Sequence, residues 1–380
     1  MVLAFYYGKG QMKIVMIGHK YVPSREGGVE IVVENLATRM AAQGHEVTLF
    51  NRKRKEYVPI TEYKGCKVES IFTVNKRALD AIVYAFFATL RAKKMLKKKQ
   101  VDIVHYHAEG PCFFLNLLPK KKKRPGTKVV VTIHGLDWQR GKWGGLATRI
   151  LRAGERKAVK YADEIIVLSH NIEQYFEDTY HRETKYIPNG IEKPQLHEPE
   201  IIKQKYGLDF NSYILFLARI VPEKGLHYLI EAWKKVVAQT GTNKKLVIAG
   251  GSSHSDEYYQ KICDMCKGDN SIIMTGFVQG QELQELYSNA YLYVLPSDIE
   301  GMPMSLLEAL SYGNVCLVSD IPENTEVINE DCYIFRRGDV DRLRHQIKKI
   351  INLNLTTHNN MVIPYTWDDV VAQTLEIYKR

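Results

Sequence analysis

The feature that most constrains the fold is an alternation of short apolar runs with helix-periodic segments along the whole chain. The apolar runs that suit buried strands lie at residues 13–18, 46–50, 102–106, 128–133, 164–168, 213–217, 245–249, 291–295 and 315–318. Between them lie segments such as residues 29–43, where apolar side chains recur at helical spacing and Gly44 follows. This alternation predicts an α/β protein with parallel sheets covered by helices on both faces.

A break in the alternation predicts two domains. The segment 187–194 (I-P-N-G-I-E-K-P) combines two prolines and a glycine, and a polar stretch follows it. A chain of 380 residues is long enough for two separate cores. We expect a Rossmann-like N-terminal domain over 1–191, with 1–11 as an extension, and a Rossmann-like C-terminal domain over 192–365. A last helix over 366–380 is expected to pack back on the N-terminal domain.

Ligands of doubly wound sheets bind at the carboxyl ends of the strands, so the loops that follow the strands are the candidate binding sites. The loop 18–28 (G-H-K-Y-V-P-S-R-E-G-G) joins the first strand to a helix. Gly27 and Gly28 let a ligand approach the helix N-terminus closely, which suits a phosphate. The alternative is a plain tight turn. The loop is not G-x-G-x-x-G, so a dehydrogenase is not indicated.

Two cations leave the end of the strand 213–217 together, in A-R-I-V-P-E-K-G (218–225). Arg219 offers a bidentate fork and Lys224 a point charge, a combination that suits a diphosphate. The alternative is a solvated Lys224 and an Arg219 paired with Glu223.

A third loop leads into a helix with two carboxylates around its start. Pro303 suits the first position of a helix, so the amides of Met304, Ser305 and Leu306 are expected to form an anion site. Glu300 and Glu308 flank it and suit the hydroxyls of a sugar. The alternative is a capping Glu300 and a surface Glu308.

These motifs together resemble the GT-B glycosyltransferases of retaining family 4. Glu300 to Glu308 has the form E-x(7)-E, and the resemblance covers nearly the whole chain from residue 12. It includes the Gly-Gly loop, V-T-I-H-G (131–135), I-P-N-G-I (187–191), 218–225, T-G-F-V (275–278) and S-D-I-P-E-N (319–324). The opening 17–30 and V-V-E-N-L-A-T-R-M (32–40) resemble a bacterial subgroup associated with rhamnosyltransferases of cell-wall and capsular polysaccharide synthesis.

The resemblance implies a fold of two Rossmann-like domains facing each other across a cleft, and a role for each matched residue. Arg219 and Lys224 would hold the donor diphosphate, Glu300 the donor sugar, and His134 would lie near the sugar and the leaving phosphate. The remaining donor-binding positions are Gly27, Gly28, Asn189, Phe277 and Val278 beside the base, Met304, Ser305, Leu306, and Glu308 on the ribose. The loop 250–253 (G-G-S-S) departs from the commoner G-D-G form, so contacts there do not carry over.

The function implied is a retaining glycosyltransferase that moves a sugar from a nucleotide-diphosphate sugar to a saccharide acceptor. The subgroup resemblance favours dTDP-L-rhamnose as donor and a lipid-diphosphate-linked acceptor. No cofactor and no metal are expected, because Arg219 and Lys224 neutralise the diphosphate. Two alternatives stay open: a GT-B nucleotide-sugar 2-epimerase, and a non-catalytic module that binds nucleotide sugars or membranes.

The net charge of +10 is concentrated in one window, residues 75–128, which holds 14 Lys and Arg against three acids. Its lysine clusters follow apolar stretches at 78–90 and 112–118, a pattern that suits anionic lipid head groups. The alternative is a core face beside a solvated face. No base-stacking aromatic series accompanies the lysines, so nucleic acid is not expected. The expected membrane patch is Arg91, Lys93, Lys94, Lys97, Lys98, Lys99, Lys120, Lys121, Lys122, Lys123 and Arg124.

Cysteine usage and hydropathy indicate a cytoplasmic protein, and the basic patch indicates peripheral association with the inner face of the cell membrane. Six cysteines are few for this length, and Cys263-x-x-Cys266 lacks a partner pair at metal-ligand spacing, so we expect it to be structural. The most apolar run, 81–90, is about half the roughly 20 residues that a membrane span needs.

Overall fold

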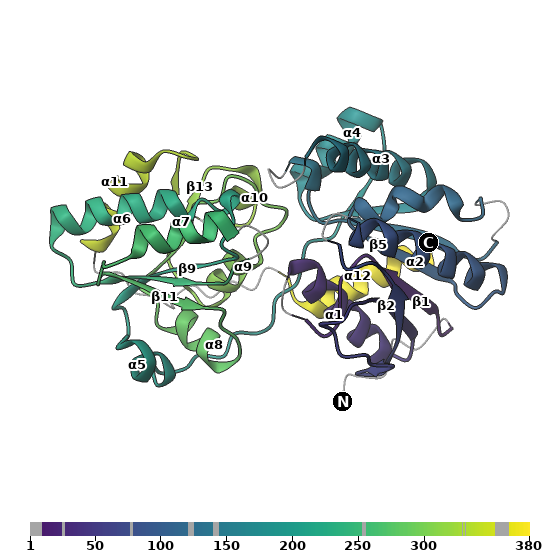
Figure 1. The fold of residues 1–380 in the computed structure, drawn as a ribbon, viewed down its shortest axis with the longest axis horizontal. Coiled ribbons are helices and arrows are strands. Elements are labelled where there is room, and N and C mark those ends of the chain that lie inside the picture. The colour runs from purple at the N-terminus through teal and green to yellow at the C-terminus, as the bar shows by residue number, and fades with distance from the viewer. Residues whose placement is uncertain are drawn as a thin grey trace. The chain divides into compact units, whose positions relative to one another are not determined.

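The structure is a computed structural model of the 380-residue chain. It describes residues 10–24, 27–76, 79–120, 125–139, 144–252, 256–328, 330, 332–353 and 365–380. The chain divides into two compact units (Figure 1). The first comprises Met1–Asn189 together with Trp367–Arg380, and the second comprises Gly190–Thr366.

The N-terminal unit is built on a sheet of order β3-β4-β2-β1-β5-β6-β7-β8, in which all pairings are parallel except β3 with β4. Between β4 and β7 the strand order reverses once, between β1 and β5, which is the doubly wound arrangement. The strands are β1 Lys13–Ile17, β2 Glu46–Lys53, β3 Glu62–Tyr63, β4 Cys66–Phe72, β5 Ile103–His107, β6 Lys128–Ile133, β7 Glu164–Val167 and β8 Lys185–Tyr186.

Helices cover both faces of this sheet. One face packs on α2 Asp80–Lys97, the 3₁₀ helix η1 Gly110–Leu117, α3 Gly145–Tyr161 and α4 His170–Tyr180. The other face carries α1 Gly28–Ala42 and α12 Trp367–Lys379. A short 3₁₀ turn, η3 Asp137–Gln139, follows β6.

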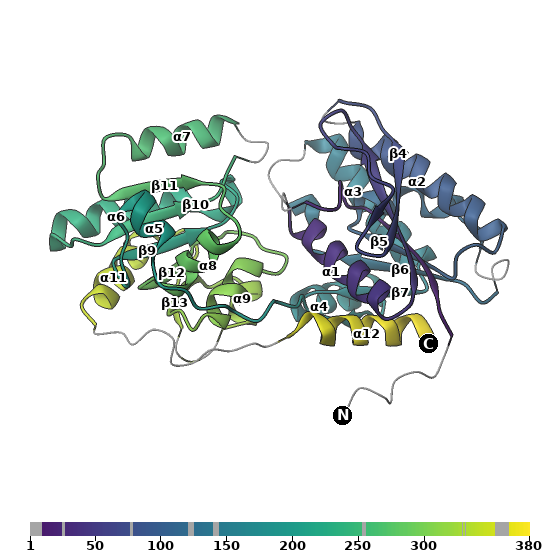
Figure 2. The same cartoon turned by 90° about the horizontal axis from the view of Figure 1, so that it is seen from below.

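The C-terminal helix belongs to the N-terminal unit. Figures 1 and 2 show α12, in yellow, running beside α1. In the core, the Tyr378 hydroxyl and Nδ1 of His105 on β5 are 2.6 Å apart, and the Lys128 ammonium donates to the Ile377 carbonyl at 3.0 Å. Both His105 and Tyr378 are buried, so this hydrogen bond ties the end of the chain to the middle of the sheet.

The C-terminal unit holds an all-parallel sheet of order β11-β10-β9-β12-β13-β14, whose order reverses between β9 and β12. Its strands are β9 Tyr213–Leu217, β10 Lys245–Ala249, β11 Ile272–Gly276, β12 Leu292–Leu295, β13 Cys316–Ser319 and β14 Tyr333–Phe335. Alternate strand residues face opposite cores: Ile214 and Phe216 pack on one side, Tyr213 and Leu215 on the other.

Helices also cover both faces of the second sheet. One core includes α6 Leu226–Thr240, α7 Asp256–Cys266 and α11 Val340–Ile351, and the other includes α5 Ile201–Tyr206, α8 Gln281–Ser288 and α9 Met304–Ser311. Figure 2 shows α7 and α9 on opposite sides of the sheet. Two short helical segments complete the unit, the 3₁₀ turn η4 Pro222–Lys224 and α10 Pro322–Thr325.

The α/β architecture with parallel sheets, predicted from the alternation, is confirmed. Along the chain, the boundary between the units falls between Asn189 and Gly190, close to the expected boundary at 191. The helix α12 begins at Trp367. The strands β3, β4, β8, β11 and β14 were not among the expected ones. β4 is an edge-side strand with only Cys66, Val68 and Ile71 buried, so its sequence lacks the continuous apolar run that marks the central strands.

We expect Tyr378→Phe to lower the stability of the N-terminal unit by about 1–2 kcal/mol, because Nδ1 of His105 loses its buried partner. Hydrogen exchange of β5 and α12 amides in urea measures this effect locally. The matched control is Tyr161→Phe, whose hydroxyl makes no hydrogen bond to the described residues. Equal effects of the two substitutions would contradict the assignment.

Candidate functional site

The two strands that flank the order reversal of the second sheet deliver a buried ion pair. Lys224 lies seven residues after the end of β9 and Glu300 five residues after the end of β12. The Lys224 ammonium is 2.5 Å from Oε1 of Glu300, and the side chains are only 15% and 5% exposed. The strand register therefore brings together a cation and an acid that are distant in the sequence.

Glu300 is held from behind by a chain of buried polar groups. The Ser297 hydroxyl donates to Oε1 of Glu300 at 2.6 Å, and the Ser319 hydroxyl donates to the Ser297 carbonyl at 2.5 Å. The side-chain amide of Asn324 then donates to the Ser319 hydroxyl at 3.0 Å. All three supporting residues are buried, so the segment 319–324 contributes to the site by orienting Glu300.

A close backbone approach fixes the Lys224 loop against the Glu300 loop. Gly225 has φ +65°, and a Cβ atom there would lie 2.0 Å from the carbonyl oxygen of Pro296. The Glu223 carbonyl also accepts a hydrogen bond from the amide of Asp298 at 2.8 Å. Only glycine fits at 225, and this requirement sets the separation of Lys224 from Glu300.

Arg219 follows the end of β9 and lies in the same loop as Lys224. The amide of Ile220 donates to the Gly251 carbonyl, and Gly250, at φ +148°, would place a Cβ atom 1.9 Å from the Ala218 carbonyl oxygen. Arg219 itself is half-buried. The loop whose sequence departs from the commoner form therefore packs directly on the Arg219 segment.

The start of α9 differs in part from the expected anion site. Pro303 is the N-cap residue, so the helix begins at Met304. The amide of Met304 donates to the Met302 carbonyl and that of Leu306 to the Pro303 carbonyl, each at 3.0 Å. Two of the three expected amides are thus engaged by the backbone. The third expected residue, Ser305, makes a contact through its side chain: its hydroxyl accepts a hydrogen bond from the Tyr293 hydroxyl at 2.7 Å.

Glu308 is held by a tyrosine that the sequence analysis did not single out. The buried Tyr287 hydroxyl donates to Oε2 of Glu308 at 2.8 Å. Burial, reinforced by this carboxylate, raises the pKa of Tyr287 well above its usual value, so its proton stays in place. Glu308 is half-buried and lies in the second turn of α9.

The two residues expected beside the base follow β11 and differ in exposure. Phe277 is 60% exposed and Val278 is buried.

In the N-terminal unit, the Gly-Gly loop carries a carboxylate of its own. Gly27 is the N-cap residue of α1 and Gly28 is its first residue. Glu30 in the first turn accepts from the Lys20 amide at 2.9 Å, and a Cβ atom on Gly27 would lie 2.5 Å from its Oε2. The carboxylate of Glu30 therefore lies at the helix start, beside the position where a phosphate was expected.

His134 follows β6, and other imidazoles lie beside it. Nε2 of half-buried His134 is 3.1 Å from Nδ1 of His107, and the rings of His107 and His105 are 4.2 Å apart. His107 and His105 are buried, as is His19 after β1. The signal for this cluster is His105-Tyr-His107, two histidines on the same face of one strand, which the sequence analysis did not use. Asn189 is buried at the end of the unit.

Aromatic and aliphatic side chains are exposed along α2. Phe86, Phe87 and Leu90 are 36%, 40% and 37% exposed, and Phe72 on β4, which is 53% exposed, packs edge-to-face on Phe87. The second apolar stretch of the window differs, since Cys112, Leu115 and Leu118 are buried in the core. The side chains of Phe113, Phe114 and Leu117 in the same stretch are half-buried, so the expected apolar surface at 112–118 is smaller than that of α2.

The basic residues of the window fall into distinct groups. Lys94, Lys97, Lys98 and Lys99 are exposed and continue the α2 stripe past Leu90, and Lys93 beside them is half-buried. Arg91 is instead paired with Glu69, with two contacts of 2.7 Å, so its charge is neutralised within the unit. Lys120 is exposed, and Lys121, Lys122, Lys123 and Arg124 lie outside the described residues.

The described residues contain no group of three or more His, Cys, Asp or Glu side chains placed to hold a metal ion. Cys263 and Cys266 are free thiols on α7. None of the described helices is long and apolar enough to cross a membrane.

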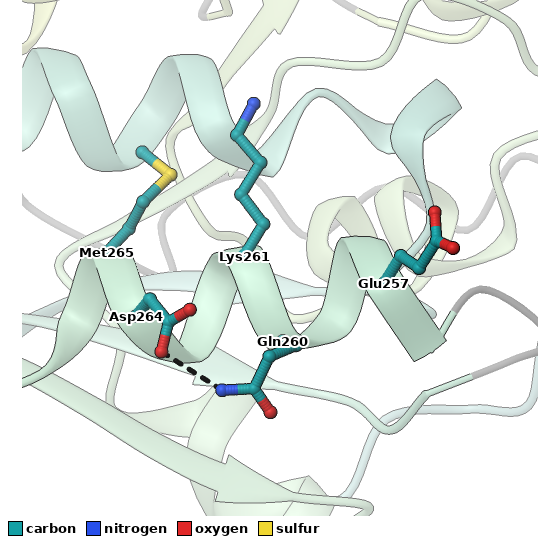
Figure 3. A pocket seen from close by; sticks show the side chains of 5 residues that line it. All are labelled: Glu257, Gln260, Lys261, Asp264 and Met265. Atoms are coloured by element: carbon teal, nitrogen blue, oxygen red, sulfur yellow. Dashed lines mark hydrogen bonds between the residues drawn. The ribbon is translucent and has the colours of Figure 1, made fainter.

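A surface hollow elsewhere on the C-terminal unit is formed by α7 alone. Glu257, Gln260, Lys261, Asp264 and Met265 line it, and Gln260 donates to Asp264 at 3.0 Å (Figure 3). It contains none of the residues that the sequence analysis selected. Its side chains belong to successive turns of one helix, so it lacks the convergence of several loops seen around Lys224 and Glu300.

Two family models match consecutive parts of the chain. Residues 26–193 match the model described as Glycosyltransferase Family 4, and residues 199–365 match the model described as Glycosyl transferases group 1. The first match lies almost wholly in the N-terminal unit and the second lies in the C-terminal unit. Together they span the loops that carry His134, Lys224 and Glu300.

Individual proteins are similar over most of the chain. An uncharacterized glycosyltransferase of Methanocaldococcus jannaschii is 25% identical, covering 97% of this chain and 98% of its own length. The UDP-Gal:α-D-GlcNAc-diphosphoundecaprenol α-1,3-galactosyltransferase of Escherichia coli is 25% identical over 80% of this chain and 81% of its own length. The crystal structure of Anabaena HepE in complex with UDP and glucose has a TM-score of 0.77 at 16% identity, covering 97% of this chain and 100% of that one.

We expect Gly225→Ala to destabilise the C-terminal unit by at least about 3 kcal/mol, because the new Cβ atom meets a backbone oxygen and must separate Lys224 from Glu300. Gly241→Ala is the matched control: its φ is +61°, and nothing lies within 4 Å of its Cβ position. We expect it to cost only the roughly 1 kcal/mol of the backbone conformation. Urea unfolding measures both, and equal costs would contradict the close-packing argument.

Proposed function

We propose that this chain, which is a glycosyltransferase of the GT-B fold, transfers a sugar from a nucleotide-diphosphate sugar to a lipid-diphosphate-linked saccharide in bacterial cell-surface polysaccharide synthesis, with retention of anomeric configuration. The donor we favour is dTDP-L-rhamnose, on the strength of the opening motif 17–30. The relative from Escherichia coli, named for a diphosphoundecaprenol acceptor, supports the acceptor class. HepE, solved with UDP and glucose, supports a nucleotide-sugar donor.

The buried pair of Lys224 and Glu300 is the observation that carries this proposal. A cation and an acid within 2.5 Å of each other supply the two kinds of contact that a sugar diphosphate requires. In our proposal Lys224 and Arg219 bind the diphosphate, and Glu300 accepts hydrogen bonds from the hydroxyls of the donor sugar. Ser305 at the start of α9 assists at the phosphates, and Glu308 binds the ribose.

The chemistry of glycosyl transfer assigns a task to each charge. As the bond from the anomeric carbon to the phosphate oxygen breaks, positive charge develops on the sugar ring and negative charge on the departing diphosphate. Arg219 and Lys224 stabilise the second charge, and a fixed orientation lets them do so without reorganisation. The acceptor hydroxyl forms the new bond from the same face, and its proton leaves with the diphosphate. Donor binding of this kind requires no metal ion.

We further propose that the exposed stripe of α2 docks on an anionic lipid surface at the inner face of the cell membrane. Phe86, Phe87 and Leu90 present apolar surface directly before the exposed lysines Lys94, Lys97 and Lys98. Apolar groups beside cations match the boundary between acyl chains and anionic head groups. A lipid-linked acceptor would be reached from such a surface.

A donor panel tests the proposed transfer. With a synthetic lipid-diphosphate saccharide, we expect product from dTDP-L-rhamnose in preference to UDP-glucose, UDP-galactose, UDP-N-acetylglucosamine and GDP-mannose, and we expect NMR to show the donor's anomeric configuration retained. Lys224→Ala and Glu300→Ala should each lower transfer by at least about 10²-fold. Lys235→Ala, in the exposed pair with Glu231, is the matched control and should retain activity.

Three outcomes of this panel would contradict the proposal. Formation of an epimerised sugar nucleotide from the donor alone would show that the reaction is epimerisation and not transfer. Preference for another donor would overturn the rhamnose assignment while leaving transfer in place. Full activity of both variants would overturn the roles of Lys224 and Glu300.

Liposome flotation tests the α2 surface. We expect binding to vesicles with anionic lipid to weaken about 30-fold in the double variant Lys97→Ala/Lys98→Ala, since each lysine near the surface contributes about 1 kcal/mol. The matched control is Lys348→Ala/Lys349→Ala on α11 of the other unit. Equal losses in both variants, or no binding by the unmodified chain at low salt, would contradict the proposed surface.

A further inference from the structure

The end of β5 carries a backbone conformation that L-residues rarely adopt. Ala108 follows β5 directly and has φ +72°, and its amide donates to the Thr132 carbonyl on β6 at 2.8 Å. β5 and β1 are the two strands between which the first sheet reverses its order. Strained residues at such a position point to a constraint on the side chains that they place. The residues on either side, His107 and Glu109, are both fully buried.

The ring of His107 is fixed on several sides. Its Nδ1 is 3.1 Å from Nε2 of His134, and its ring lies against that of His105. His105 is held in turn, because its two nitrogens lie 2.7 Å from the Thr132 hydroxyl and 2.6 Å from the Tyr378 hydroxyl. The backbone is fixed as well, since a Cβ atom on Gly18 would lie 2.2 Å from the His107 carbonyl oxygen.

The protonation of His107 follows from its surroundings. Burial, together with the neighbouring imidazoles of His105, His134 and His19, lowers the pKa of His107 well below its usual value, so the ring is neutral and carries one N–H. Among the residues that the structure describes, its buried Nε2 has no hydrogen-bond partner. A buried N–H without an acceptor is among the rarest arrangements in proteins. The proton is therefore on Nδ1, where it is donated to Nε2 of His134.

Glu109 fixes the backbone beyond His134. Its Oε1 accepts a hydrogen bond from the amide of Asp137 at 3.0 Å, three residues after His134. Burial, and then the negative charge of Asp137, raises the pKa of Glu109 well above its usual value, which favours the neutral carboxyl. A neutral carboxyl that still accepts a hydrogen bond has a close structural equivalent in glutamine.

We propose that residues 107–109 are a positioning element for His134, in which His107 holds the His134 ring with its proton on Nδ1 and Glu109 holds the following loop. In this arrangement Nε2 of His134 is the acceptor toward His107, and the ring carries its one N–H on Nδ1. The consequence for transfer rests on the proposed function, whereas the tautomer of His134 does not.

The tautomer is tested by imidazole ¹⁵N NMR of the full chain at about pH 8. We expect the His134 signals of the Nδ1–H form in the unmodified protein and in His107→Asn, whose side-chain amide nitrogen replaces Nδ1. His107→Leu, which fills the space without a donor, should lose this form. An Nε2–H tautomer in the unmodified protein, or an unchanged tautomer in His107→Leu, would overturn the proposal.

Steady-state kinetics test the consequence for transfer. We expect His107→Leu and Glu109→Ala to lower kcat about 10- to 100-fold with donor KM within about threefold, because a misplaced His134 acts on the reacting geometry. His107→Asn and Glu109→Gln should restore most of kcat. Loss in Glu109→Gln equal to that in Glu109→Ala would contradict the neutral carboxyl. If the unmodified protein transfers none of the donors, the proposed function fails, and the NMR result still decides the positioning proposal.

Discussion

The direction of the strands is the constraint on which both candidate sites depend. In a parallel sheet all carboxyl ends lie at one edge, and where the strand order reverses, the loops of two neighbouring strands turn to opposite faces. In the second sheet this happens between β9 and β12, which deliver Lys224 and Glu300. In the first sheet it happens between β1 and β5, which deliver His19 and His107. Residues far apart in the sequence come together there because the two loops diverge and leave a space between them.

Much of this architecture was predictable because fully buried parallel strands have an unmistakable sequence. Tyr213–Leu217 and Lys245–Ala249 begin and end where their apolar runs do. The edge strands were not predictable in the same way, since β4 buries only part of its length and β3 and β8 have two residues each. Hydrophobic periodicity reflects burial, so a strand that is mostly exposed gives no clear periodic pattern in the sequence.

The candidate site was predictable in its charged residues and not in their supports. Arg219 and Lys224 stand out because they follow an apolar strand end together, and Glu300 and Glu308 stand out because they flank a helix start that begins with proline. Ser297, Tyr287 and Tyr293 do not, because a serine or tyrosine is equally common in a core or on a surface. Their roles follow from hydrogen bonds of 2.6–2.8 Å to residues 3–21 positions away, which only the packed sheet defines. The same holds for Met304 and Leu306, whose amides donate to the carbonyls of Met302 and Pro303 in tight turns at the start of the helix.

The two units use polarity in different ways, and the difference has a physical reason. The C-terminal unit buries a full charge pair, which is stable only while both partners are in place. The N-terminal unit instead surrounds His134 with groups whose neutral forms are favoured by burial, which lowers the pKa of His105 and His107 and raises that of Glu109. Supports of this kind fix the ring without placing a charge beside it, so the orientation of His134 and the charges of the C-terminal pair are set by separate residues.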